Sequence, residues 1–134
     1  TNAYGMFYNA YSFNGDLSTW DVSSITEMRS MLATTREAFN SDVSKWDVGS
    51  VTSFYYMFGN NKGFNGDVSK WDTSKGKDFT QMFYNCFQFN GDVSNWNMAS
   101  ATTLMGMFFY GNVTWMGMQL LARRISQICH MGSI

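Results

Sequence analysis

The stretch Phe64-Asn65-Gly66-Asp67-Val68-Ser69-Lys70-Trp71-Asp72 decides the fold of this chain, because the sequence contains four versions of it. These versions occupy residues 13–21, 39–47, 64–72 and 89–97. Their tryptophans follow one another at intervals of 26, 25 and 25 residues and are Trp20, Trp46, Trp71 and Trp96. A fixed period of this length is the signature of stacked repeats, in which each unit covers the apolar face of its neighbour. The sequence therefore predicts a repeat architecture.

Each repeat has two segments. The Asn-Gly pair of the quoted stretch predicts a tight turn that leads into a short strand. In the second segment Val51, Phe54, Met57 and Phe58 are three and four residues apart, which is the helical interval, and Ser50 stands where a helix N-cap is expected. We therefore predict a leucine-rich-repeat-like solenoid, with one short strand plus one or two helical turns in each coil of 25 residues.

The repeats define the predicted domain organisation. Residues 4–12 match the second half of the later repeats, and complete copies start at residues 13, 39, 64 and 89. We assign residues 1–111 to the repeat solenoid. Because the chain opens inside a repeat, we expect it to be part of a longer protein.

The pattern is lost after Gly111, since Thr114 and Leu121 stand where the next Phe and Trp are due. Residues 115–129 have the apolar spacing of a helix. A terminal element that covers the last coil is typical of repeat proteins. Residues 112–134 are therefore either a C-terminal capping helix or a divergent tail.

At these motifs the chain resembles the BspA-type leucine-rich-repeat family of surface proteins. The resemblance is carried by Phe13-Asn14-Gly15-Asp16-Leu17-Ser18-Thr19-Trp20-Asp21, then Ser24-Ile25-Thr26-Glu27-Met28-Arg29-Ser30-Met31-Leu32, and by the three later copies. It covers residues 4–111. It implies a secreted or cell-surface protein used for adhesion and protein binding, without catalytic residues.

Composition excludes several classes of function. The net charge of −1 gives no basic surface for nucleic acid. No run of 18 apolar residues is present, so we expect no membrane span. No residue set indicates a cofactor. Cys86 and Cys129 are too few for a disulfide framework, and the sequence leaves open whether they pair. Asn112 begins a glycosylation sequon, which matters only in a secreted protein.

Apolar residues recur in columns that stacking would align. We predict an interior ladder, because each coil buries its apolar face only against its neighbours. The alternative is a stripe that stacks on a cofactor or carbohydrate. Besides the four tryptophans, the ladder comprises Phe13, Phe39, Phe64, Phe89, Met31, Met57, Met82 and Met107.

Aspartates recur in a column as well, namely Asp16, Asp42, Asp67 and Asp92. One hypothesis is a row of calcium sites, because carboxylates in turns containing glycine suit Ca²⁺. Each coil supplies only one or two carboxylates, however. We therefore favour the interpretation that each Asp accepts backbone N–H groups of its own turn.

Two functions are consistent with these observations. The first is a non-catalytic, extracellular or cell-surface protein that mediates adhesion or binds a protein or glycan. The alternative is a structural protein whose units bind copies of themselves in an oligomer or filament. An enzyme is not expected, because no nucleophile, base and orienting group come together. We expect recognition at the unrepeated positions, such as Thr19, Lys45, Lys70 and Asn95, and in the loops after each Met-Phe pair.

Overall fold

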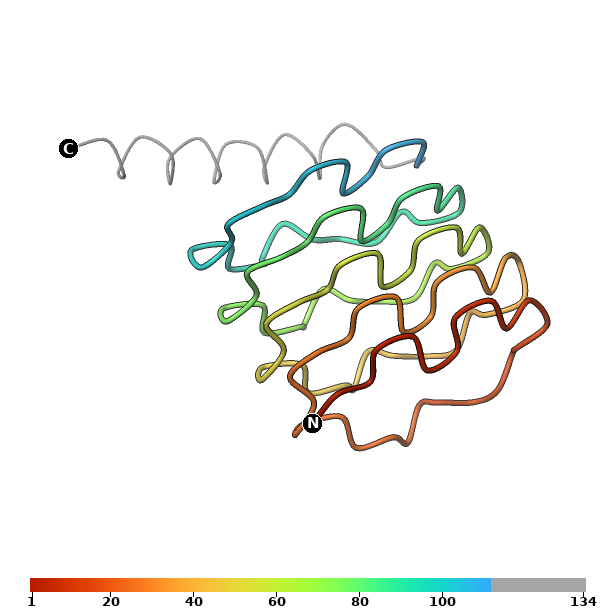
Figure 1. Ribbon diagram of the computed structural model, residues 1–134, viewed down its shortest axis with the longest axis horizontal. Coiled ribbons are helices and arrows are strands. Elements are labelled where there is room, and N and C mark those ends of the chain that lie inside the picture. Colours follow the sequence, from red (N-terminus) through yellow and green to blue (C-terminus); the bar gives the residue numbers. More distant parts are fainter. Residues whose placement is uncertain (112–134) are drawn as a thin grey trace.

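The computed structural model describes residues 1–111, which wind into coils stacked one on another (Figure 1). Isolated parallel β-bridges join equivalent points of successive coils, pairing Asn2 with Glu27, Glu27 with Ser53, Ser53 with Asp78, and Asp78 with Thr103. We number the coils from these bridges. Coil 1 is residues 1–25, coil 2 is 26–51, coil 3 is 52–76, coil 4 is 77–101, and residues 102–111 begin coil 5.

The predicted leucine-rich-repeat solenoid of strands and helical turns is wrong. Residues 1–111 contain no helix, and their only β-structure is the four isolated bridges. Turns joined by short irregular segments make up the rest of each coil. The predicted capping helix at 115–129 lies outside the described residues.

The segment predicted to be helical is a series of β-turns. It lies in the first half of each coil, which we name the bridge side (residues 1–11, 26–37, 52–62, 77–87 and 102–111). In coil 3, Met57 N–H donates to the carbonyl of Phe54 and Gly59 N–H to that of Tyr56, at 3.1 Å each. Tyr56 and Asn60 have φ angles of 52° and 57°, in the left-handed region. A helix cannot continue through such residues, whereas a type II turn requires one at its third position.

Left-handed residues also direct backbone groups to the next coil. The N–H groups of Phe54, Tyr56, Phe58 and Asn60 donate to carbonyls of coil 4 over 2.7–2.9 Å. In a helix these N–H groups would be bonded inside their own coil. Turns with inward apolar residues at Phe54, Met57 and Phe58 reproduce the helical spacing and leave alternate N–H groups free for stacking.

The second half of each coil, the tryptophan side (residues 12–25, 38–51, 63–76 and 88–101), lacks the predicted strand. Side chains capture the N–H groups that a strand would use, as where Asp67 Oδ1 accepts from Ser69 N–H at 2.9 Å. Side chains also join the coils. Asn65 N–H donates to Asn40 Oδ1 of the preceding coil at 2.9 Å, and the indole N–H of Trp71 donates to the carbonyl of Val43 at 3.0 Å.

Columns of stacked side chains fill the interior. The ring of Trp71 lies 6.3 Å from that of Trp46 and 6.2 Å from that of Trp96, with interplanar angles of 10° and 4°. Phenylalanines of the two sides meet inside each coil, and Phe58 stacks on Phe64 at 3.9 Å. The buried ladder residues are Trp46, Trp71, Trp96, Phe39, Phe64, Phe89, Met31, Met57, Met82 and Met107. Phe13 is partly buried, and Trp20 is 38% exposed.

This packing predicts different effects for two tryptophan substitutions. Trp71→Ala removes a fully stacked ring and its hydrogen bond to Val43, and should lower the free energy of unfolding by about 3–5 kcal/mol, the range for large-to-small core changes. Trp20→Ala, the matched control, should cost clearly less, because Trp20 is partly exposed. Urea unfolding followed by fluorescence measures both. Equal losses would contradict the packing described above.

Candidate functional site

The outer surface of the bridge side carries a column of polar residues with left-handed backbone, Asn9, Thr34, Asn60 and Asn85, which we name the asparagine column. Asparagine tolerates this conformation better than other residues with a side chain. Neighbouring members are hydrogen-bonded: Thr34 Oγ1 donates to Asn9 Oδ1 and Asn85 Nδ2 donates to Asn60 Oδ1, both at 2.7 Å. The column therefore presents ordered amide and hydroxyl groups across four coils.

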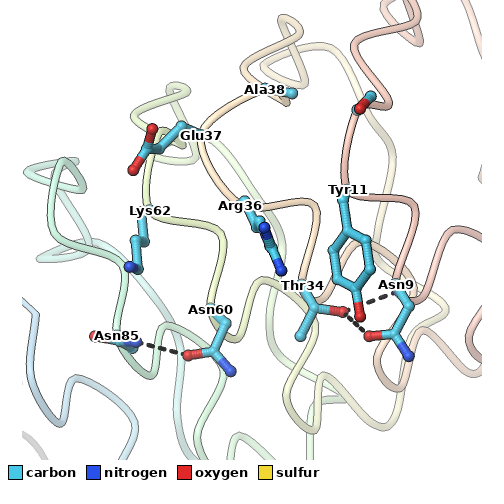
Figure 2. Close-up of a pocket in the computed structure, with 10 residues that line it drawn as sticks. Asn9, Tyr11, Thr34, Arg36, Glu37, Ala38, Asn60, Lys62 and Asn85 are labelled. Carbon is cyan, nitrogen blue, oxygen red and sulfur yellow. Dashed lines mark hydrogen bonds between the residues drawn. The ribbon is translucent and has the colours of Figure 1, made fainter.

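An open hollow of about 880 Å³, the polar hollow, lies along this column (Figure 2). Arg36 is held over the ring of Tyr11, with its guanidinium carbon 4.2 Å from the ring centre. Such cation–π contacts hold a guanidinium in place while leaving part of it available to a ligand. The lining residues are Asn9, Tyr11, Ser12, Thr34, Arg36, Glu37, Ala38, Asn60, Lys62 and Asn85.

The extra residue of coil 2 shapes this hollow. Between Thr35 and Phe39 the chain has three residues, where the other coils have two at this point. The added length is taken up at Arg36, which has a φ of 59°. Gly63 of coil 3 lies directly against the inserted segment, and a Cβ there would collide with the carbonyl of Glu37. The repeat is thus interrupted where the polar hollow lies.

A second hollow of about 630 Å³, the tyrosine slot, lies on the same side of the molecule. Tyr56 connects it with the asparagine column, because the Tyr56 hydroxyl accepts a hydrogen bond from Asn60 Nδ2. No charged side chain is among its lining residues, which are Tyr4, Gly5, Tyr8, Ser30, Tyr55, Tyr56, Gln81 and Tyr84.

Exposed apolar side chains are concentrated on the bridge side, and three of them, Tyr4, Tyr8 and Tyr11, line the two hollows. Residues 1–111 expose nine large apolar side chains, and all but Trp20 lie on the bridge side. Exposed apolar patches of this kind mark binding surfaces, and aromatic residues are enriched in interfaces. The eight are Tyr4, Met6, Tyr8, Tyr11, Phe87, Met105, Phe109 and Tyr110.

The aspartate column lies on the tryptophan side, away from both hollows. Asp16, Asp42, Asp67 and Asp92 each accept the N–H of the serine two residues later, at 2.8–2.9 Å. These backbone hydrogen bonds, followed by those of the serine hydroxyls, lower the pKa of all four carboxyls. Within residues 1–111, no three His, Cys, Asp or Glu side chains come together as a metal-binding group. The carboxylates of this column therefore stabilise their own turns by accepting backbone N–H groups.

Other residues singled out in the sequence lie elsewhere. The positions Thr19, Lys45, Lys70 and Asn95 line neither hollow, whereas the loops after the Met-Phe pairs line the polar hollow. Burial raises the pKa of the Cys86 thiol to about 12, and Cys86 Sγ donates to the carbonyl of Phe58 at 2.8 Å. The thiol is therefore protonated and unreactive at neutral pH. Asn112 and Cys129 lie outside the described residues.

Sequence reasoning missed the tyrosine slot and the asparagine column. The signal for the column was the run of residues that tolerate a left-handed backbone, one per coil after each Met-Phe pair. The signal for the slot was the alignment of Gly5, Ser30, Tyr56, Gln81 and Gly106 at one position of successive coils. Both require residues 25 apart to be compared as neighbours.

The fold and these surfaces define a repeat protein of stacked turn-rich coils, with a buried aromatic core and one outer side rich in exposed aromatic residues. The chain belongs to the DUF285 family, described as Mycoplasma protein of unknown function, whose model matches residues 1–115. This match supports neither the leucine-rich-repeat class nor an adhesive role. No curated protein and no solved structure matches the chain. In the part of the chain that the structure describes, no helix has the length and apolarity to cross a membrane.

The lowered carboxyl pKa values predict loss of stability in acid. A carboxyl whose pKa is lower in the folded than in the unfolded state stabilises the fold fully above the unfolded pKa, about 3.9, and this contribution is lost as pH falls through the folded pKa. The urea midpoint should therefore fall between pH 5 and pH 2.5. In Asp42→Asn/Asp67→Asn it should fall less, because an amide keeps the turn bond without titrating, as Asn97 does toward Ala99 N–H. The same pH dependence in both proteins would contradict this assignment.

Proposed function

We propose that this protein is a non-catalytic binding protein that recognises a protein or glycan ligand through its bridge side, outside the cell or at the cell surface. The observation that carries the proposal is the presence on this side of eight exposed large apolar side chains, three of which line two hollows. The repeats' resemblance to those of BspA-type surface proteins supports the location. The two hollows fall within the range of about 300–1,000 Å³ that is common for ligand sites.

Chemical differences between the two sides also support the bridge side. Seven of the ten acidic residues of the chain lie on the tryptophan side in turns of regular spacing, and all seven accept backbone N–H groups of their own turns. The bridge side instead combines aromatic rings, amides and the two cations Arg36 and Lys62 at one hollow. Aromatic and arginine side chains are the residues that most often dominate binding energy in interfaces.

A pair of matched double variants tests which side binds. Biotinylated protein is applied to an array of immobilised glycans and extracellular proteins. Arg36→Ala/Lys62→Ala and Lys45→Ala/Lys70→Ala each remove two positive charges, the first pair at the polar hollow and the second on the tryptophan side. We expect a ligand of the wild type to bind at least tenfold more weakly to the first variant and unchanged to the second.

The opposite pattern, or no ligand for the wild type, would contradict the proposal. The alternative function, assembly of copies of this chain, is examined on the same samples by light scattering. A monomeric mass at micromolar concentration argues against assembly. A mass that rises with concentration, and is reduced by neither double variant, would favour assembly over ligand binding at the polar hollow.

A further inference from the structure

The tyrosine slot exists because coil 2 has small side chains at two positions where other coils have tyrosines. At the position where coil 3 has Tyr56, coil 2 has Ser30, and where coils 1 and 4 have Tyr8 and Tyr84, coil 2 has Ala33. The slot is therefore bounded by tyrosines of coil 1 on one flank and of coil 3 on the other. Backbones two coils apart are separated by roughly 9.5 Å, if each step equals the usual spacing of about 4.8 Å between bridged chains. This separation leaves room for one ring between two aromatic walls, since stacked rings lie about 4.5–7 Å apart.

The wall formed by Tyr56 is fixed in place. Its ring lies over Gly59, where a Cβ would collide with the ring carbons. Tyr84 packs against it with ring centres 6.1 Å apart, and Asn60 Nδ2 donates to its hydroxyl. The neighbouring Tyr55 is itself covered by Arg29, whose guanidinium carbon is 4.9 Å from the ring centre. Rigid tyrosines give large contact area at low cost in conformational entropy.

Tyr56 is the largest side chain at the left-handed position that opens the bridge-side turns of each coil. Its φ of 52° is unfavourable for a bulky residue. The same position holds Gly5 and Gly106 in coils 1 and 5, and Ser30 and Gln81, with φ of 52° and 53°, in coils 2 and 4. A left-handed conformation costs about 1–2 kcal/mol for a residue with a Cβ. Glycine would remove this cost, so the phenol ring is retained against a local preference. Because every coil has a left-handed residue at this position, the conformation belongs to the repeat, and the tyrosine side chain is what distinguishes coil 3.

The chemistry of the lining indicates a neutral ligand with polar edges. The slot offers phenol hydroxyls, the Ser30 hydroxyl and the Gln81 amide, and no charged group lines it. Since the Tyr56 hydroxyl accepts from Asn60, its own hydrogen is available to donate to a ligand. An aromatic side chain would leave these polar groups unused. A sugar ring would use both the aromatic walls, through the C–H groups on its faces, and the polar rim, through its hydroxyls.

We infer that the tyrosine slot binds one neutral pyranose ring of a glycan, packed between Tyr8 and Tyr56 above Ser30. This inference rests on the proposed function, because it names the ligand class for part of the bridge side. The polar hollow, with Arg36 and Lys62, is a separate surface, and the asparagine column and Tyr56 lie between the two.

The test uses an array of neutral glycans ending in galactose, glucose or N-acetylglucosamine, with sialylated counterparts, followed by saturation-transfer NMR on the best neutral glycan. Tyr8→Ala and Ser30→Tyr should each weaken binding at least tenfold, the first by removing a wall and the second by filling the slot. The control is Lys45→Ala/Lys70→Ala, because both lysines lie on the tryptophan side and line neither hollow. It should bind as the wild type does. Ser30→Gln, which places in coil 2 the residue that coil 4 has there, provides a second filled slot if Ser30→Tyr does not fold.

Binding of sialylated glycans alone, no neutral glycan bound, or full binding by a folded filled-slot variant would each overturn the inference. The two proposals can fail separately. If the protein binds a protein ligand, Arg36→Ala/Lys62→Ala abolishes that binding, and no neutral glycan binds, the proposed function is supported and the inference about the slot is contradicted. A neutral glycan whose binding is lost only in Lys45→Ala/Lys70→Ala would contradict both proposals.

Discussion

Each buried tryptophan fastens its coil to the one before it, and the rest of the structure depends on this contact. The indole N–H groups of Trp46, Trp71 and Trp96 donate to the carbonyls of Leu17, Val43 and Val68 over 2.8–3.0 Å. The tryptophan side has no bridges of its own, so its coils are joined by these bonds, by the side-chain amides of Asn40 and Asn65, and by hydroxyl groups such as those of Ser41 and Thr73. The same three carbonyls accept the backbone N–H groups of Trp20, Trp46 and Trp71 over 3.1–3.2 Å. Each carbonyl therefore has one hydrogen bond within its own coil and one from the tryptophan of the next coil.

Because the backbone stacks on the bridge side and side chains stack on the tryptophan side, the two outer surfaces are free to differ. Asp-Ser turns occupy the outside of the tryptophan side, where the repeat is kept most strictly. On the bridge side, left-handed residues point their side chains outward and only their backbone conformation is repeated. Residue type can therefore vary there from coil to coil, as from Ser30 to Tyr56 to Gln81. This freedom produces hollows between coils, and it is the physical basis of the proposed binding side.

The repeat period could be read from the sequence, since the spacing of Trp20, Trp46, Trp71 and Trp96 equals the spacing of the bridges. The inward residues could also be listed, because apolar side chains every three to four positions must face the core in a helix and in these turns alike. For the same reason the sequence could not distinguish the two structures, and the helical prediction was wrong. A left-handed backbone is signalled by Gly5 or Asn60 but not by Tyr56 or Gln81. The exposure of Trp20 was not predictable from its motif, which is identical in kind to the three buried copies.

Exchange of indole hydrogens with solvent, followed by ¹⁵N NMR on assigned tryptophan signals, tests the central claim most directly. The account predicts slow exchange for Trp46, Trp71 and Trp96, whose N–H groups are bonded inside the stack. It predicts fast exchange for Trp20, which is 38% exposed and has no preceding coil within the described residues to accept its hydrogen. Equally fast exchange for all four signals would show that the tryptophans do not fasten the coils, and would contradict the account.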